Sequence, residues 1–176
     1  MKNTILALIA AFSIQALAND GKAIDPVPRA YIPVLQYNQG GGMPGPGFMS
    51  SRQITVLREG DVLVHEHYLP KKWNDPNDKG EDRRYRLPNV SEGDMQKIKD
   101  TVAELSGGEF QEPTSPGCAD APGMQYTIWK NGQQIPVYKV FNCQRYELKD
   151  VSQRPNAQSI KNFLDALANS TRPIKH

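Results

Sequence analysis

The dipeptide Asn131-Gly132 restricts the fold of this 176-residue chain more than any other short segment. Both residues accept the left-handed backbone conformation that a two-residue hairpin turn requires, and alternating apolar and polar residues flank them. The pattern therefore predicts a β-hairpin with strands over about residues 125–130 and 134–141.

The chain contains two cysteines, Cys118 and Cys143. Pairing outward from the predicted hairpin turn places Cys143 opposite Asp120, only two positions from Cys118. We therefore expect a Cys118–Cys143 disulfide that closes the open end of the hairpin, worth about 3 kcal/mol in the chain-entropy model. A redox or metal-binding cysteine pair is the alternative, but the short C-x-x-C spacing of such sites is missing.

Further strands are predicted ahead of this hairpin. Runs of β-branched, aromatic and apolar residues between Gly, Pro and Asn clusters indicate strands over about residues 31–38, 53–58, 61–69 and 83–87. With Glu59-Gly60 as a two-residue turn, Val56 pairs with Leu63 and Ile54 with His65. The long polar segment before the fourth run makes a loop, and the strands form an antiparallel meander.

Two helices are expected. The first begins at Ser91, with Asp94 as the acid of an imperfect capping box, and ends near Leu105 before two glycines. Its apolar stripe is Met95, Ile98, Val102 and Leu105. The second follows Pro155, with an apolar stripe of Ile160, Phe163, Leu164 and Leu167. Because no βαβ alternation is present, we predict an α+β fold: an antiparallel sheet, made of a meander plus a hairpin, with two helices packed on one face and one disulfide.

The N-terminus has the parts of a secretory signal peptide. Lys2 supplies the positive charge, residues 5–14 are apolar, and Ala16-Leu17-Ala18 is a small-residue cleavage site. The apolar run is shorter than the roughly 20 residues of a spanning helix. The expected division of the chain is a signal peptide over 1–18, a flexible lead over 19–30, a single domain over 31–169 and a tail over 170–176. We predict a periplasmic or secreted protein without membrane insertion after cleavage.

Charge and motifs exclude several functional classes. The chain has 21 basic and 19 acidic residues, and removal of residues 1–18 takes away only Lys2, leaving a net charge of about +1. Nucleic-acid and membrane-surface binding rest on a clear positive excess, so neither is expected. No G-x-S-x-G motif, phosphate-binding loop or paired-carboxylate motif is present. We therefore expect a monomeric, non-catalytic protein without a cofactor, which binds another protein.

His65 and His67 are the candidate metal ligands. Side chains at i and i+2 of a strand point to the same face, so the two imidazoles could share a metal ion. A catalytic zinc would need a third protein ligand, for which Asp61 is the candidate. The alternatives are a small hydrolase that uses one of these histidines, or an ordinary polar face of an exposed strand.

The polar segment after the third strand offers two weaker alternatives. Residues 75–86 begin like an EF-hand loop, but Lys79 and Arg86 occupy two of its ligand positions. Basic and aromatic residues flank the same loop at 71–73 and 83–86, as in proteins that bind single-stranded polyanions. A solvated loop beside a charged edge strand is the simpler interpretation.

Residues 40–48 are rich in glycine and proline and end in an aromatic residue. They follow Tyr37-Asn38 and precede the strand over 53–58, the turn at Gly60 and the helix that opens at Ser91. This order resembles the emfourin type of small bacterial inhibitors of thermolysin-like metalloproteases, over the N-terminal half of the mature chain. The two cysteines and the long loop over 70–82 depart from the emfourin pattern.

The resemblance implies an inhibitor that acts on an extracellular protease through a protruding loop. Prolines and a disulfide-bonded scaffold would lower the entropic cost of ordering such a loop. The expected contact residues are Gly40, Gly41, Gly42, Met43, Pro44, Pro46 and Phe48, with Met43 and Phe48 as apolar anchors. A plain linker at 40–48, or a structural protein of the cell envelope, are the alternatives.

Overall fold

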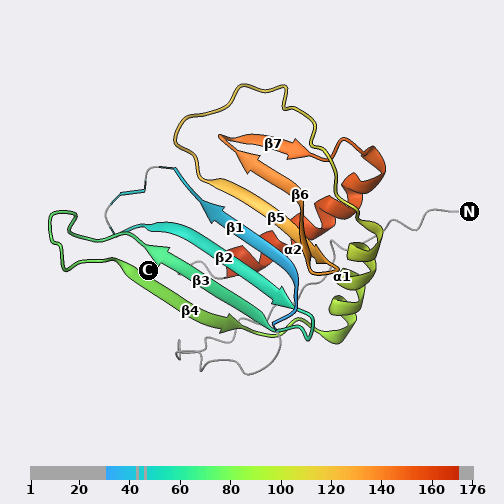
Figure 1. Cartoon of the computed structure of the whole chain (residues 1–176), viewed down its shortest axis with the longest axis horizontal. Coiled ribbons are helices and arrows are strands. Elements are labelled where there is room, and N and C mark those ends of the chain that lie inside the picture. The colour runs from blue at the N-terminus through green and yellow to red at the C-terminus, as the bar shows by residue number, and fades with distance from the viewer. Residues whose placement is uncertain (1–30, 43, 46, 171–176) are drawn as a thin grey trace, which may run out of the picture.

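The computed structural model describes residues 31–42, 44–45 and 47–170 of the chain (Figure 1). The predicted signal peptide over 1–18 and the predicted lead over 19–30 lie outside these residues, as do Met43, Pro46 and residues 171–176. In chain order the elements are β1 (Pro33–Gly40), β2 (Met49–Leu57), β3 (Val62–Tyr68), β4 (Glu81–Leu87), α1 (Glu92–Glu104), β5 (Gly123–Lys130), β6 (Gln133–Phe141), β7 (Gln144–Glu147), the 3₁₀ helix η1 (Val151–Gln153) and α2 (Arg154–Ser170).

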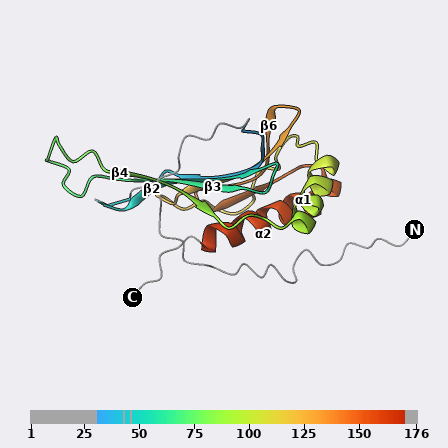
Figure 2. The ribbon, with the colours of Figure 1, turned by 90° about the horizontal axis from the view of Figure 1, so that it is seen from below.

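The strands form one antiparallel seven-stranded sheet in the order β4-β3-β2-β1-β5-β6-β7. Both helices cover the same face, and none of the described helices covers the other face, here called the open face (Figure 2). The predicted α+β class, the two helices on one face and the disulfide are confirmed. Neither described helix combines the length and apolar content needed to cross a membrane.

The order of elements divides the sheet into two similar halves. In each half an antiparallel meander is followed by a helix: β1 to β4 and α1, then β5 to β7 and α2. The first strands of the two halves, β1 and β5, pair at the centre of the sheet, with Tyr37 opposite Tyr126. The two meanders therefore extend outward from this central pair, and each contributes its helix to the same face.

The core lies between the helices and the sheet. The predicted stripe of α1 is buried, including Leu105 immediately after the helix, and so is the predicted stripe of α2. Ser91 caps α1 as predicted, because its hydroxyl oxygen accepts a hydrogen bond from the Asp94 N–H at 3.2 Å. Alternate residues of the strands meet the helices, as Ile54 and Val64 show, whereas Gln53 and His65 face the opposite side.

The predicted register of the first hairpin is wrong by one residue. Val56 pairs with Val62 rather than with Leu63, and Ile54 pairs with Val64 rather than with His65. The turn contains Arg58 as well as the two predicted residues, and Gly60 has a φ of 90°. A three-residue loop that ends in a left-handed glycine is a common hairpin connection. A one-residue slip turns every side chain to the other face, so this register decides which residues of β3 are buried.

Strand β7 was not predicted. It follows β6 through a tight turn at Asn142-Cys143, where both residues have a positive φ, of 48° and 63°. Asn131-Gly132 makes the predicted turn between β5 and β6 with a φ of 52° and 75°. A cysteine seldom takes this conformation, so Asn-Cys carries no hairpin signal comparable to Asn-Gly.

Candidate binding surface

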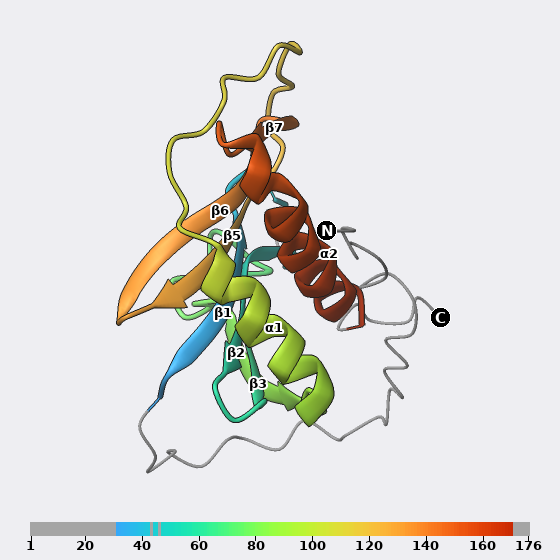
Figure 3. The ribbon, with the colours of Figure 1, turned by 90° about the vertical axis from the view of Figure 1, so that its right-hand side faces the viewer.

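The two ends of the sheet differ in their connections. At one end the chain turns tightly, through residues 58–61 and 131–132. At the other end, here called the loop end, lie the long connections 41–48 and 69–80, the later part of the connection 105–122, and the turn at Asn142-Cys143 (Figure 1). Figure 3 shows the connection 105–122 extending beyond the sheet and the helices. Long loops on a rigid scaffold are where binding residues concentrate in proteins.

The connection 41–48 is anchored on both sides. Gly42 lies so close to the connection 105–122 that an added Cβ would be 2.9 Å from the carbonyl oxygen of Asp120, and its φ is 76°. At the other end, the Gly47 N–H donates to the Pro70 carbonyl at 3.1 Å, and the Phe48 carbonyl accepts from the Leu69 N–H at 2.9 Å. The neighbouring loops therefore restrain this segment.

The predicted contact residues do not all lie in one loop. Gly40 is the last residue of β1 and belongs to the sheet, with Ser51 and Gly123 as its neighbours. Gly41, Gly42 and Pro44 line a small hollow of about 200 Å³ between the connections 41–48 and 105–122. Met43 and Pro46 lie outside the described residues. Phe48 is 66% exposed, as an apolar anchor for a partner would be.

Two further aromatic side chains are exposed at the loop end. Trp73 in the connection 69–80 is 64% exposed, and Phe141 at the end of β6 is 56% exposed. The prediction of contact residues omitted both. Phe141 fits the apolar pattern of the strand predicted over 134–141. The sequence therefore gives no sign that its side chain is exposed rather than part of the core. Aromatic residues are enriched at protein interfaces, where they supply large apolar contact areas.

Asp78 orders the connection 69–80. Its carboxylate accepts hydrogen bonds from the backbone N–H groups of Lys71, Lys72 and Gly80, at 2.9 to 3.1 Å. The hydrogen bonds from Lys72 and Gly80 are the main cause that lowers the pKa of Asp78 below its usual value. This carboxylate therefore caps a turn of the loop, an ordinary role for Asp.

The disulfide connects two segments of the loop end. Cys118 in the connection 105–122 is bonded to Cys143 in the β6–β7 turn, with a Cα–Cα distance of 5.5 Å. The Cys118 N–H also donates to the Asn142 carbonyl at 2.8 Å. The predicted pairing is confirmed, and it restrains the long connection at a point where no strand pairs with it.

His65 and His67 lie on one face of β3, as predicted, and both contact a single carboxylate of β4. The Asp82 oxygen Oδ1 lies 3.2 Å from Nε2 of His65 and 3.1 Å from Nδ1 of His67. These contacts lower the pKa of Asp82, with the hydrogen bond to His67 as the larger cause. Asp61, the expected third ligand, is instead paired with Arg86 at 3.3 Å.

These two histidines are partly exposed, and Asp82 is a side chain that both contact. Ser51 is the ladder partner of His67, so Ser51, His67 and Asp82 share one row of the open face. No side-chain hydrogen bond joins Ser51 to His67 among the contacts of the described residues. Among the described residues, no group of three or more His, Cys, Asp or Glu side chains is arranged to hold a metal ion.

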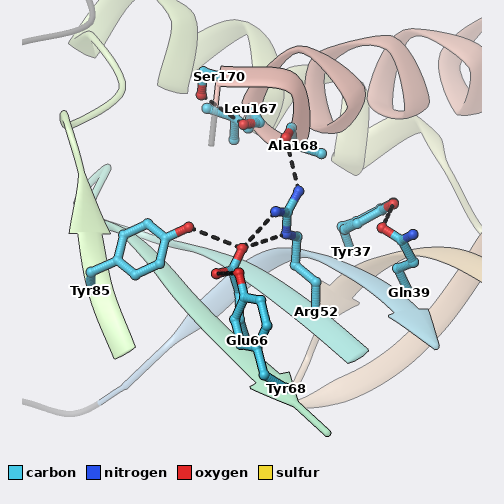
Figure 4. Close-up of polar contacts among 9 residues, drawn as sticks. All are labelled: Tyr37, Gln39, Arg52, Glu66, Tyr68, Tyr85, Leu167, Ala168 and Ser170. Atoms are coloured by element: carbon cyan, nitrogen blue, oxygen red, sulfur yellow. Dashed lines mark hydrogen bonds and ion pairs between the residues drawn. The ribbon is translucent and has the colours of Figure 1, made fainter. Parts of the chain in front are cut away.

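On the helix-covered face, a buried ion pair joins β2 to β3 (Figure 4). Nε and Nη2 of Arg52 lie 2.7 and 2.6 Å from one carboxylate oxygen of Glu66. The hydroxyl groups of Tyr68 and Tyr85 donate to the same carboxylate at 3.0 and 3.2 Å. Nη1 of Arg52 donates to the Ala168 carbonyl in the last turn of α2 at 3.1 Å. The network therefore fixes α2 to the sheet.

The sequence interpretation missed this pair because the predicted register placed Glu66 on the open face. In the observed register, Val62, Val64 and Glu66 share the helix-covered face. With the observed register, the sequence would have shown a carboxylate in a row of otherwise apolar residues, and such a carboxylate indicates a buried charge with a partner.

Comparison with known proteins gives no family: no protein-family model matches the chain, and no curated protein sequence matches it. The resemblance to emfourin-type inhibitors therefore stays a prediction. The fold and the loop end are the basis for any functional proposal.

Proposed function

We propose that this protein is an exported, non-catalytic binding domain that holds another protein at its loop end. The observation that carries the proposal is the gathering of three long connections, with exposed Phe48, Trp73 and Phe141, at one end of a sheet whose other end has tight turns. Aromatic anchors surrounded by polar loops are typical of protein interfaces.

The particular form we propose is a protease inhibitor that inserts residues 40–48 into the cleft of an extracellular protease. An inhibitory loop must keep its shape when bound, and a loop that is restrained beforehand loses less entropy on binding. The contacts of Gly42 with the connection 105–122, and of Gly47 and Phe48 with the connection 69–80, support this requirement. Phe48 and Met43 would be the apolar anchors.

Export is the second part of the proposal. A disulfide persists in oxidising compartments and is rare in the cytosol, so the Cys118–Cys143 bond supports a periplasmic or secreted location. The signal-like residues 1–18 support it independently. Mass spectrometry of the protein from a culture would test the cleavage, with Asn19 expected as the first residue.

The inhibitory function is tested by titrating the purified chain, residues 19–176, against a panel of secreted proteases that includes a thermolysin-like enzyme. We expect stoichiometric inhibition of at least one enzyme, and its loss in a Met43→Asp variant, because a carboxylate would be desolvated without a partner at the centre of the contact.

Asn131→Asp is the control for charge, because it also adds one negative charge, Asn131 is exposed in the tight turn at the opposite end of the sheet, and Asp-Gly suits the same turn. This variant should inhibit like the unmodified chain. The absence of inhibition against every enzyme in the panel would refute the inhibitor proposal.

A further inference from the structure

The open face of the sheet contains a hollow of about 680 Å³. Its floor is formed where two glycines of neighbouring strands, Gly40 of β1 and Gly123 of β5, stand opposite each other. No residue of α1 or α2 lines the hollow, and most of its lining side chains alternate with the core residues. It is therefore a depression in the uncovered face, large enough for a small ligand.

The fold requires neither glycine. Neither residue has a positive φ, so another residue could adopt the same backbone conformation. An added Cβ would also find room: its nearest neighbour would be the Ser51 Cβ at 3.7 Å for Gly40, and a ring carbon of Phe141 at 3.5 Å for Gly123. Glycine in a strand costs stability relative to alanine, by about 0.5 to 1 kcal/mol. Because neither glycine has a side chain, the backbone at the floor of the hollow is exposed. Glycines have this role at sites where a ligand approaches the backbone closely.

Polar side chains that both donate and accept hydrogen bonds border this floor. Asn38 has Gln53 and Gln125 as its two ladder partners, so three carboxamides stand side by side across three adjacent strands. Gln53 and Ser51 make no side-chain hydrogen bond among the contacts of the described residues. A carboxamide has two donor hydrogens and an acceptor oxygen with two lone pairs. Asn38 Oδ1 accepts one hydrogen bond from Gln36 and Gln125 Nε2 donates one to Thr127, and the remaining donors and acceptors suit a ligand with many hydroxyl groups.

An aromatic wall and a cation complete the hollow. The ring of Phe141 lies beside Gly123 and is exposed over more than half of its surface. Nζ of Lys139 is held over the rings of Phe110 and Tyr146, at 4.6 and 4.7 Å from their centres. No carboxylate among the residues that the structure describes lines the hollow. The face of an aromatic ring carries negative charge density, which attracts the weakly positive C–H groups on the flat side of a sugar ring.

From these observations we infer that the hollow is a glycan-binding site, in which a sugar ring lies over Gly40 and Gly123, stacks on Phe141 and pairs its hydroxyl groups with the three carboxamides. The ligand is a neutral oligosaccharide or one that bears a carboxylate for Lys139. A peptide strand is less suited, because β1 and β5 have both edges paired and offer no free backbone groups. The inference does not rest on the proposed protein-binding function, although Gly40 and Phe141 belong to both surfaces.

The test is the binding of residues 19–176 to an array of immobilised neutral, N-acetylated and uronic-acid oligosaccharides, with extended peptides printed beside them. Calorimetry with the best-bound oligosaccharide then gives the affinity. We expect Gly40→Val to weaken this affinity by about tenfold or more, because its methyl groups fill the floor. The denaturant midpoint of Gly40→Val should stay the same or rise, since valine suits a strand. Phe141→Ala should weaken the same binding.

Phe48→Asp separates this inference from the proposed function, because Phe48 does not line the hollow. This variant should bind the oligosaccharide like the unmodified chain, whatever its effect on protease inhibition. The inference is overturned if no oligosaccharide is retained, if only peptides are retained, or if a folded Gly40→Val variant binds the sugar with unchanged affinity.

Discussion

Glu66 accepts four hydrogen bonds or ionic contacts in an almost fully buried position, which is what a carboxylate needs in such a place. Arg52 is equally buried, and its remaining contact is to a carbonyl group in the last turn of α2. The C-terminal end of a helix carries partial negative charge, which favours a cation there. At the residue scale, this pair is one polar link between α2 and the sheet, and the hydrogen bond from Tyr126 of β5 to Asp165 of α2 is another.

Removing one partner of the pair should be costly. Glu66→Gln keeps the shape of the side chain but leaves the Arg52 charge uncompensated, so we expect the free energy of unfolding to fall by about 3 to 5 kcal/mol. Urea denaturation followed by circular dichroism measures this loss. The double variant Arg52→Met/Glu66→Leu should lose less, because it buries no unpaired charge. A loss below about 1 kcal/mol in Glu66→Gln would contradict the account.

Tyr126 makes the free energy of unfolding depend on pH in the alkaline range. Burial is the main cause that raises its pKa above the ordinary value of 10.0, and the hydrogen bond to Asp165 adds to it. Because the pKa of Tyr126 is raised in the folded state, its contribution to the free energy of unfolding is fully present below about pH 10. This contribution is lost as the pH rises further, because only the unfolded chain then ionises.

We therefore expect the free energy of unfolding to fall with pH above about 10, by up to about 1.4 kcal/mol per unit from this group. Urea titrations at several alkaline pH values measure the slope. Tyr126→Phe removes the ionisable group, so its slope should be shallower. An identical slope in both proteins would exclude Tyr126 as the source.

At the element scale, helices and turns with a strong local signal were predictable from the sequence. The stripe and cap of α1, the stripe of α2 and the Asn131-Gly132 turn rest on contacts within a few residues. The register of β2 and β3 was not predictable, because Glu59-Gly60 suits a two-residue turn as well as the last part of a three-residue loop. Tertiary packing decides between them by burying Val62 and Val64.

The disulfide should matter most for the short edge strand. Cys118 and Cys143 are 25 residues apart, and loss of such a closed loop costs about 3 kcal/mol. Cys143 also lies in the turn that starts β7, with a positive φ that few cysteines adopt. In the Cys118→Ala/Cys143→Ala variant we expect the amide hydrogens of residues 144–147 to exchange faster before the rest of the sheet does.

Native-state hydrogen exchange with mass spectrometry measures this local effect, and urea denaturation measures the global one. The central strands β1 and β5 serve as internal references, because they have paired neighbours on both sides. Equal acceleration across all strands would show that the disulfide acts on the whole domain and not on β7.

At the scale of the whole molecule, the two faces and the two ends of one sheet differ in what they contribute. The helix-covered face contains the core, the tight-turn end connects the strands, and the loop end and open face present polar and aromatic groups to solvent. The sequence predicted the helical part of the core, because both helix stripes follow helical periodicity, whereas the one-residue error in register misplaced the side chains of β3. It could not predict which exposed residues share one end of the sheet, since Phe48, Trp73 and Phe141 are separated along the chain and come to the loop end only through the order of the strands.

The most direct test of the binding account compares two apolar residues that are equally exposed, Phe48 at the loop end and Val151 in η1. Both are 66% exposed, so a change of either to aspartate should leave the fold intact. The measurement is the inhibition constant of each variant against the protease that the unmodified chain inhibits. The account predicts a loss of about tenfold or more for Phe48→Asp and an unchanged constant for Val151→Asp. Equal constants for the two variants, or a loss confined to Val151→Asp, would contradict it.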